Sequence, residues 1–344
     1  METTWVTLLP GLEVAFSVEP LGVLFALVAS FLWIITTIYA IGYMRGHNED
    51  NQTRFFFCFA LSISTVMAIC FSDNLLTLFI FYELLTLSTY PLVTHAGTED
   101  AKHGGRVYLG ILLSTSIAFL LFAILGTWVT AGTLEFTPGG IFNSEHSGNV
   151  VALLLVLFCY GIGKAALMPF HRWLPAAMVA PTPVSSLLHA VAVVKAGVFS
   201  ILKVIIYIFG IDKLPDIATT DLMLYIGAAT VLLSSCVAMT KDNLKARLAY
   251  STVSQLSYIV VGALLATSVA AAGASLHIAT HAVGKITLFF CAGAIMVAAH
   301  KKNISDMVGL GRKMPITMIA FAIGALSIIG LPPMAGTWSK WYLV

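Results

Sequence analysis

Residues 149–170 read NVVALLLVLFCYGIGKAALMPF, an apolar run that leads through two glycines to a lysine, Lys164, and a proline, Pro169. A helix that crosses a bilayer needs about 20 predominantly apolar residues. The rest of the chain has the same character, since 59% of its 344 residues are hydrophobic and 10% are charged. Soluble domains carry about 25% charged residues. The sequence therefore predicts an all-α, polytopic transmembrane helix bundle, with residues 1–344 as one integral membrane domain.

Ten segments are apolar and long enough to cross a membrane: about 21–43, 55–71, 74–94, 107–130, 150–168, 184–209, 221–240, 248–267, 271–299 and 314–344. Cytoplasmic loops carry an excess of Lys and Arg. Alternate loops place on one side Arg45, Arg54, Lys102, Arg106, Arg172, Lys241, Lys245, Arg247, Lys301, Lys302, Arg312 and Lys313, and on the other side Lys213. The N-terminal end, the 131–149 loop and the C-terminus are thus expected to face outward, with a bacterial inner membrane as the location.

The five cysteines lie singly inside apolar runs, at positions 58, 70, 159, 236 and 291. They lack the CxxC spacing of a zinc site and give no sign of a disulfide framework. The sequence also shows no basic patch typical of nucleic-acid binding. Neither a metal, a cofactor nor a nucleic-acid partner is expected.

Charged residues inside the predicted spans are few. They are five lysines, Lys164, Lys195, Lys203, Lys285 and Lys340, and one acid well inside a span, Glu83. A charge at mid-bilayer costs ~2.5–3.5 kcal/mol on insertion scales, and such residues usually mark ion or proton pathways. Lys203 lies near the outward end of its helix, where its long side chain is expected to snorkel. Lys164 paired with Glu83 predicts a proton-loading site, with a static ion pair between two helices as the alternative.

His277, His281 and Lys285 recur every four residues in SLHIATHAVGKITLFFC (275–291), so they share one stripe of a helix. Histidine titrates near neutral pH, and the stripe therefore predicts a line of proton acceptors. Core histidines and a metal or haem ligand pair are the alternatives. His189 is another membrane histidine, with Ser185 one turn before it and Lys195 on a different helical face.

Two proline-rich stretches interrupt the predicted helices. The first, PFHRWLPAAMVAPTP (169–183), contains Pro169, Pro175, Pro181 and Pro183, and the second, GLPPMAGTWSK (330–340), contains Pro332 and Pro333. Each proline removes a backbone donor and obstructs the helix. Lys164 precedes the first break and Lys340 follows the second. Paired broken helices in the two halves of a transporter point to its transport site.

The chain resembles the antiporter-like membrane subunits shared by respiratory complex I, membrane-bound hydrogenases and Mrp-type cation/proton antiporters. Four stretches carry the resemblance: FYELLTLSTYPLV (81–93), GKAALMPFHRWLPAAMVAPTPVSSLLHAVAVVKAGVF (163–199), LKARLAYSTVSQLSYIVVG (244–262) and HIATHAVGKITLFFCAG (277–293). The closing GLPPMAGTWSKWYL (330–343) is similar to the D-type subunit of the Mrp antiporters.

The resemblance implies a role for each matching residue. Glu83 would tune a neighbouring lysine, and Lys164 would accept a proton from the cytoplasm. His281 with Lys285 would form the central relay, and Lys340 would release protons outward. The supporting residues would be His277 and His189, with Lys195 and Ser185 as possible additions.

The resemblance also implies inverted five-helix repeats, about 55–209 and an incomplete 221–344. Two positions depart from the family pattern, Ala176 in place of an aspartate and Gly284 in place of an aromatic residue. The ten spans are fewer than the family's usual number, so the chain is expected to begin at the family's third helix and stop within its twelfth.

The expected function is proton translocation by one subunit of a multisubunit antiporter that exchanges Na⁺ or another monovalent cation for protons. This is transport rather than enzyme catalysis, with other membrane subunits and lipid as partners. One alternative is the proton-pumping subunit of a complex I-like NADH:quinone oxidoreductase or a membrane hydrogenase. A haem-binding cytochrome using His277 and His281, and a non-conducting scaffold subunit, are the others.

Overall fold

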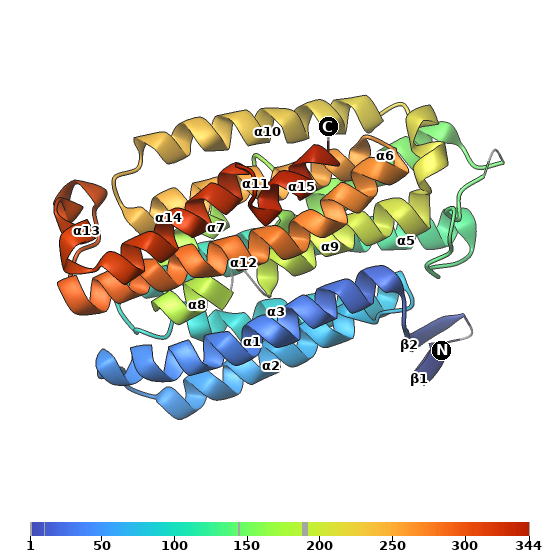
Figure 1. Cartoon of the computed structure of the whole chain (residues 1–344). Coiled ribbons are helices and arrows are strands. Elements are labelled where there is room, and N and C mark those ends of the chain that lie inside the picture. The colour runs from blue at the N-terminus through green and yellow to red at the C-terminus, as the bar shows by residue number, and fades with distance from the viewer. Residues whose placement is uncertain (1, 10, 144, 188–191, 344) are drawn as a thin grey trace.

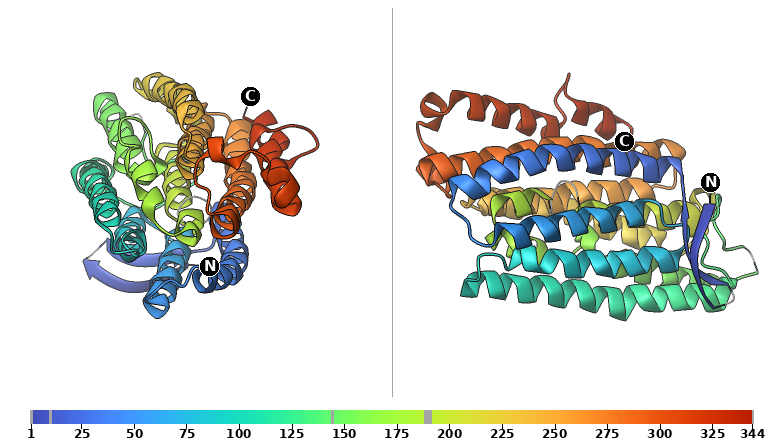
Figure 2. Two further views of the ribbon diagram at one scale, coloured as in Figure 1. Left: turned by 90° about the vertical axis from the view of Figure 1, so that its left-hand side faces the viewer. Right: turned by 90° about the horizontal axis from the view of Figure 1, so that it is seen from below.

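The computed structural model of the protein describes residues 2–9, 11–143, 145–187 and 192–343. Long helices run side by side along one axis, with a small hairpin at one end (Figure 1). Seen along that axis, they form a bundle in which the N-terminal, middle and C-terminal helices lie next to one another in turn (Figure 2).

The elements follow the predicted spans in order. The first part contains β1 (Glu2–Leu9), β2 (Leu12–Ser17), α1 (Pro20–Gly46), α2 (Gln52–Cys70), α3 (Leu75–Val93), α4 (Glu99–Thr115), η1 (Ser116–Leu120) and α5 (Leu121–Ala131). The middle contains α6 (Gly148–Gly161), η2 (Gly163–Ala165), α7 (Trp173–Ala176), η3 (Ala177–Val179), α8 (Thr182–Ser186), α9 (Val193–Val204), η5 (Ile205–Phe209) and η6 (Ile211–Asp216). The last part contains α10 (Thr220–Thr240), α11 (Leu244–Leu264), α12 (Ser268–Ala299), η7 (Ile304–Met307), α13 (Leu310–Lys313), α14 (Pro315–Ile329) and α15 (Ala335–Trp341).

The helices are long and apolar enough for a membrane protein. In the described residues, six helical segments meet the length and composition needed to cross a bilayer: α1, α2, α3, the continuous α4–α5 segment, α10 and α12. The helices α6 and α14 are apolar but shorter. Both precede the predicted breaks, so their shortness is the expected consequence of a helix that stops inside the membrane. The limits of the two repeats stay a prediction.

An N-terminal hairpin covers one end of the bundle, where the sequence analysis expected no strands. Strands β1 and β2 pair antiparallel across a turn that contains Gly11. Asn74 joins the hairpin to α3, because its Nδ2 donates to the Glu13 carbonyl at 2.8 Å while its Oδ1 accepts from Thr77 N at 2.8 Å. The second bond is a helix N-cap, which satisfies a backbone donor of the first turn. The Pro10–Gly11 dipeptide between the two strands is the sequence signal for the turn.

The loops separate into two ends as the charge pattern predicted. At the hairpin end, Thr137 N donates to Tyr207 O and Ile141 N donates to Ile208 O. At the opposite end, segments 43–49, 96–100, 175–181, 243–245 and 301–302 meet around one cavity. The basic loops belong to this second end, which the positive-inside rule assigns to the cytoplasm. Leu343 lies beside Gly262, near the outward end of α11, as expected for the C-terminal segment.

The first break begins earlier than its prolines suggest. Helix α6 was expected to continue to about residue 168 but ends at Gly161, so Lys164 lies inside the break and not before it. The glycines explain this, because a Cβ at Gly161 would collide with the Leu120 backbone and one at Gly163 with the Thr115 side chain. The indole of Trp173 donates to the freed Gly163 carbonyl at 3.0 Å. Buried protein thus satisfies the broken backbone, as membrane depth requires.

The prolines differ in what they do. Pro169 and the pair Pro332–Pro333 lie in non-helical segments, and Pro181 is the N-cap residue of α8. Pro183, expected to break a helix, stands instead in the first turn of α8, where a missing N–H costs nothing. Pro175 lies within the four-residue helix α7.

Candidate functional site

Lys164 is fully buried and is held by α3. Its Nζ donates to the Tyr82 carbonyl at 2.8 Å and to Thr86 Oγ1 at 2.6 Å, and it lies 3.2 Å from the centroid of the Tyr82 ring. Its backbone N donates to the Tyr82 hydroxyl at 3.0 Å. A bent segment and a straight helix are therefore joined through one lysine, and the partners of its ammonium group are neutral.

Glu83 does not form the direct ion pair with Lys164 that the sequence suggested. The described part of the chain has four ion pairs, and none includes Glu83. Both carboxylate oxygens are buried and have no hydrogen-bond partner among the described residues. Glu83 belongs to the same turn of α3 as Tyr82 and Thr86, the two residues that bind Lys164 Nζ. A role in tuning the lysine remains a proposal.

Lys195 lies where the two halves of the bundle meet. It comes from α9, is fully buried, and its Nζ is hydrogen-bonded to Nδ1 of His281 on α12. On the other side, α9 packs on the first break so closely that a Cβ at Gly197 would collide with the backbone of Lys164 and Ala165. The sequence analysis treated Lys195 as a supporting residue, whereas the structure places it between Lys164 and His281.

His281 continues along α12 to His277 and from there to the second broken helix. The two rings stack with centroids 5.8 Å apart, and both side chains are 1% exposed. His277 Nδ1 lies 2.9 Å from Ser339 Oγ on α15. Ser339 also lies 3.0 Å from Thr280 Oγ1 and donates to the Gly336 carbonyl at 3.2 Å. Ser339, which the sequence analysis missed and which directly precedes Lys340, therefore links the histidines to α15.

Lys340 follows the second break and is half-buried. Its Nζ donates to the carbonyls of Ile328 and Ile329 at 2.8 and 3.3 Å, at the end of α14. These carbonyls lack helical partners because the helix stops there, and a cation is favourable at a helix C-terminus. The backbone of Lys164 lies against α9 at Gly197, and contacts then link Lys195, His281, His277 and Ser339 in turn. These five residues, which extend from the first break to the second, are here called the polar file.

Lys285 points away from this file although it shares a helix with the histidines. It is fully buried, and its Nζ donates to the Leu248 carbonyl at 3.1 Å and to Ser251 Oγ at 2.8 Å, both on α11. Ser185, proposed as a supporting residue, is buried near the carbonyls of Ala180 and Pro181 in its own segment. His189 lies outside the described residues.

Lys203 does not snorkel, contrary to the expectation. Its side chain is fully buried, and its Nζ forms an ion pair with Glu19 at 2.6 Å and donates to the Ser72 carbonyl. Glu19 precedes α1, so its nearness to α9 is a tertiary contact that the sequence pattern does not show. The partner explains the burial, because a paired charge can leave water at lower cost.

The two histidines stack ring against ring, and their Nδ1 atoms have partners in Ser339 and Lys195. Among the described residues, no group of three or more His, Cys, Asp and Glu side chains could hold a metal ion. The haem alternative for His277 and His281 stays a prediction.

The fold and the site define a multi-pass membrane protein with a buried lysine–histidine file between two broken helices. The family model described as "NADH:quinone oxidoreductase/Mrp antiporter, TM" matches residues 72–344, and the one described as "NADH-Ubiquinone oxidoreductase (complex I), chain 5 N-terminus" matches residues 5–56. The chain belongs to this antiporter-like family of integral membrane subunits.

Curated relatives agree with the family models. The chain is 34% identical over 338 residues to "NADH-quinone oxidoreductase subunit N" of Desulforudis audaxviator, covering 97% of this chain and 66% of that protein. It is 32% identical over 346 residues to "NAD(P)H-quinone oxidoreductase chain 5" of Synechocystis, covering 96% of this chain and 49% of that protein. The chain thus spans about half to two thirds of the length of these relatives.

Two solved structures share the fold. The Mrp complex of Dietzia matches with a TM-score of 0.84 and 28% identity, covering 100% of this chain and 37% of the other. An archaeal membrane-bound sulfane sulfur reductase matches with a TM-score of 0.86 and 23% identity, covering 96% and 67%. The second likeness shows the fold alone.

Proposed function

We propose that the chain translocates protons along the buried file as a subunit of a larger membrane assembly. The observation that carries this proposal is the contact between Lys195 and His281, which joins the half with the first break to the half with the second. Ionisable groups in a membrane interior are costly and mark ion and proton pathways. The contacts from Lys195 through His281 and His277 to Ser339 support such a pathway between the two broken helices.

In this proposal each residue takes part in one proton-transfer step. Lys164 accepts a proton from the cytoplasmic side, and Glu83 changes the ease of that step through its nearby charge. The proton then passes to Lys195, to the ring nitrogens of His281 and His277, and through the Ser339 hydroxyl. Lys340, beside the broken end of α14, releases it outward. No bond other than N–H and O–H bonds is made or broken.

We infer that a redox-driven, complex I-like assembly is the more strongly supported setting. The curated relatives described above are named as quinone oxidoreductase subunits, and the model matching residues 5–56 is that of a complex I chain. The membrane chain itself would hold no redox group, so its partners would supply the driving reaction. This reverses the order expected from the sequence, in which a sodium-coupled Mrp antiporter came first.

A cation/proton antiporter is the second candidate. The Dietzia Mrp complex matches the whole of this chain, at 28% identity. In that setting a gradient of Na⁺ or another monovalent cation would drive proton movement along the same file. The similarity of residues 330–343 to the D-type Mrp subunit favours that subunit type. Partner subunits decide between the two settings.

The test is proton movement in inside-out vesicles that contain the full assembly, driven either by NADH or by a Na⁺ pulse. We expect Lys195→Ala to abolish proton movement with whichever driving force works in the native assembly. The matched control is Lys102→Ala, because Lys102 is 55% exposed and pairs with Glu99 on the surface. Native proton movement in Lys195→Ala would contradict the proposal. Co-purification of partner subunits with the inactive variant separates translocation from a scaffold role.

A further inference from the structure

A cavity of about 660 Å³ opens between the loops at the cytoplasmic end, outside the file described above. It lies where the ends of α1, α3, α11 and α12 meet the segment that leads into α8. Charged and titratable side chains line it, including His47, Glu49, Asp100 and Lys245. Its size is enough for many water molecules, since one water occupies about 30 Å³ of liquid.

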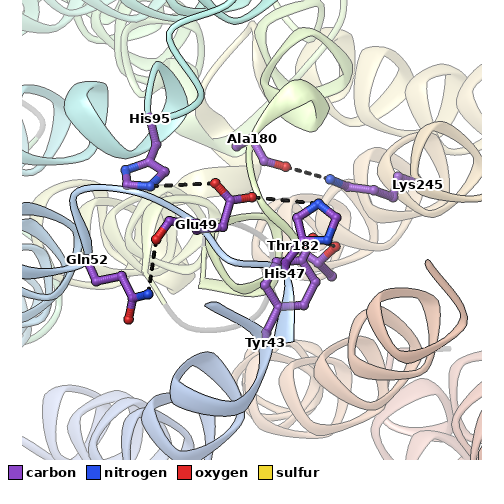
Figure 3. Close-up of polar contacts among 8 residues, drawn as sticks. All are labelled: Tyr43, His47, Glu49, Gln52, His95, Ala180, Thr182 and Lys245. Carbon is purple, nitrogen blue, oxygen red and sulfur yellow. Dashed lines mark hydrogen bonds and ion pairs between the residues drawn. The ribbon is translucent and has the colours of Figure 1, made fainter. Parts of the chain in front are cut away.

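Polar contacts hold the walls of this cavity (Figure 3). The Glu49 carboxylate lies between two histidines, 3.8 Å from His47 Nε2 and 4.0 Å from His95 Nε2. Across from it, Lys245 Nζ donates to the Ala180 carbonyl at 2.6 Å. Proton acceptors of both the carboxylate and the imidazole kind are therefore gathered at the rim, as expected where protons are collected from water.

The inner wall of the cavity is apolar. It belongs to a cluster of five buried residues, here called the gate: Leu244, Leu248, Leu288, Phe289 and Ala292. Leu244 and Ala292 also line the cavity, as does Met178, which packs against the gate.

Lys285 lies directly behind the gate. Its ammonium group binds the carbonyl of Leu248, a gate residue, and the hydroxyl of Ser251 one turn further along α11. On α12, Lys285 is seven residues before Ala292, which corresponds to about 10 Å along the helix axis. The gate therefore borders the cavity through Leu244 and Ala292 and contacts the buried lysine through Leu248.

We propose that this cavity is a cytoplasmic entrance for protons to the second half of the bundle, with the gate as its closing layer and Lys285 as its first acceptor. The inference rests on the proposed function and adds an entrance separate from Lys164. A proton crosses from cavity water to the neutral amine of Lys285 when water enters the gate, because apolar constrictions conduct only when wet. The Lys285 ammonium faces α11, so water between α11 and α12 carries the proton from Lys285 to His281, one turn away on α12.

Blocking the cavity after the protein has folded tests this entrance without disturbing assembly. Met296 lines the cavity, and Ala298, two residues on, is exposed on another side of α12. The variants Met296→Cys and Ala298→Cys are made in the full assembly, and inside-out vesicles are treated with a sulfonate-bearing methanethiosulfonate. The unsubstituted chain, with its own cysteines, receives the same reagent.

We expect mass spectrometry to show that Met296→Cys is labelled. The labelled variant should lose half or more of its proton movement. The labelled Ala298→Cys variant and the treated native chain should keep theirs. Labelled Met296→Cys with unchanged proton movement would overturn the inference, and so would a position 296 that the reagent cannot reach or an equal loss in Ala298→Cys. Failure of the proposed function is distinguishable, since it would show as native proton movement in Lys195→Ala, whatever the labelling result.

Discussion

Ser339 offers the sharpest test of how the second broken helix joins the proton file. Its hydroxyl is fully buried and lies within hydrogen-bond distance of His277 Nδ1 and Thr280 Oγ1, both on α12. Ser339→Ala removes these two links between α12 and α15 while leaving the helix backbone unchanged. Both the stability of the α12–α15 contact and the rate of proton movement should therefore fall.

The magnitude follows from the two lost bonds. A buried hydrogen bond contributes about 1 kcal/mol net, so the variant should lose about 2 kcal/mol of stability at the α12–α15 contact. If the same hydroxyl carries the proton between His277 and Lys340, the barrier to that step rises by a similar amount, which corresponds to about a 30-fold slower rate. The assays are unfolding of the purified assembly and proton movement in vesicles.

Thr337 supplies the matched control on the same short helix. Its Oγ1 is buried and has no hydrogen-bond partner among the described residues, so Thr337→Val removes no hydrogen bond and keeps the shape of the side chain. We expect it to keep native proton movement. A Ser339→Ala protein that moves protons at the native rate would refute the reasoning, even with a measurable loss of stability. That outcome would make Ser339 a packing residue.

Three further predictions concern residues outside the file, one of which packs against it. Glu19→Gln leaves Lys203 buried without its carboxylate and should lower the free energy of unfolding by about 3–5 kcal/mol, most of which the double variant with Lys203→Met should recover in the same unfolding assay. Gly197→Ala places a methyl group against the backbone of the first break, and we expect a loss of about 1–3 kcal/mol together with reduced proton movement. Hydrogen bonds from the Ser305 hydroxyl and backbone N–H hold the pKa of Asp242 below its usual value. Because a lowered carboxyl pKa stabilises the fold above the unfolded pKa of about 4, amide exchange at Ser305 should rise as the pH falls through the folded pKa, and Asp242→Asn should remove that dependence.

The order of the spans followed from the sequence because their signal is local, whereas six of the ten predicted spans form helices long and apolar enough to cross a bilayer in the described residues. Length, apolar content and the position of Lys and Arg in alternate loops are read along the chain without knowledge of tertiary contacts. The early end of α6 could not be predicted from such local signals. The glycines at 161 and 163 are visible in the sequence, but the backbone of Leu120 and the side chain of Thr115, which make them necessary, belong to other segments.

The roles of the lysines depend on contacts between distant segments. Lys195 and His281 are 86 positions apart, and Lys203 pairs with Glu19 from the far end of the chain. A helical-face argument shows which residues of one helix share a side but not which residue of another helix lies opposite. It therefore grouped Lys285 with the histidines and treated Lys195 as a supporting residue. It also could not identify Glu19 as the partner of Lys203.

The partners of the buried lysines separate those that suit proton transfer from the one that suits structure. Lys164, Lys195, Lys285 and Lys340 bind carbonyls, hydroxyls or an imidazole, which form hydrogen bonds with an amine whether or not it is charged. Lys203 alone among the five span lysines binds a carboxylate in the described residues, and the attraction between the two charges would be lost if either were neutralised. A group that must take up and release a proton in each cycle works best when neither state is held by an opposite charge. By this criterion Lys203 and Glu19 join the start of α1 to α9, whereas we propose that the other four lysines change their protonation. Glu83, whose carboxylate has no hydrogen-bond partner among the described residues, would then bias the first of them.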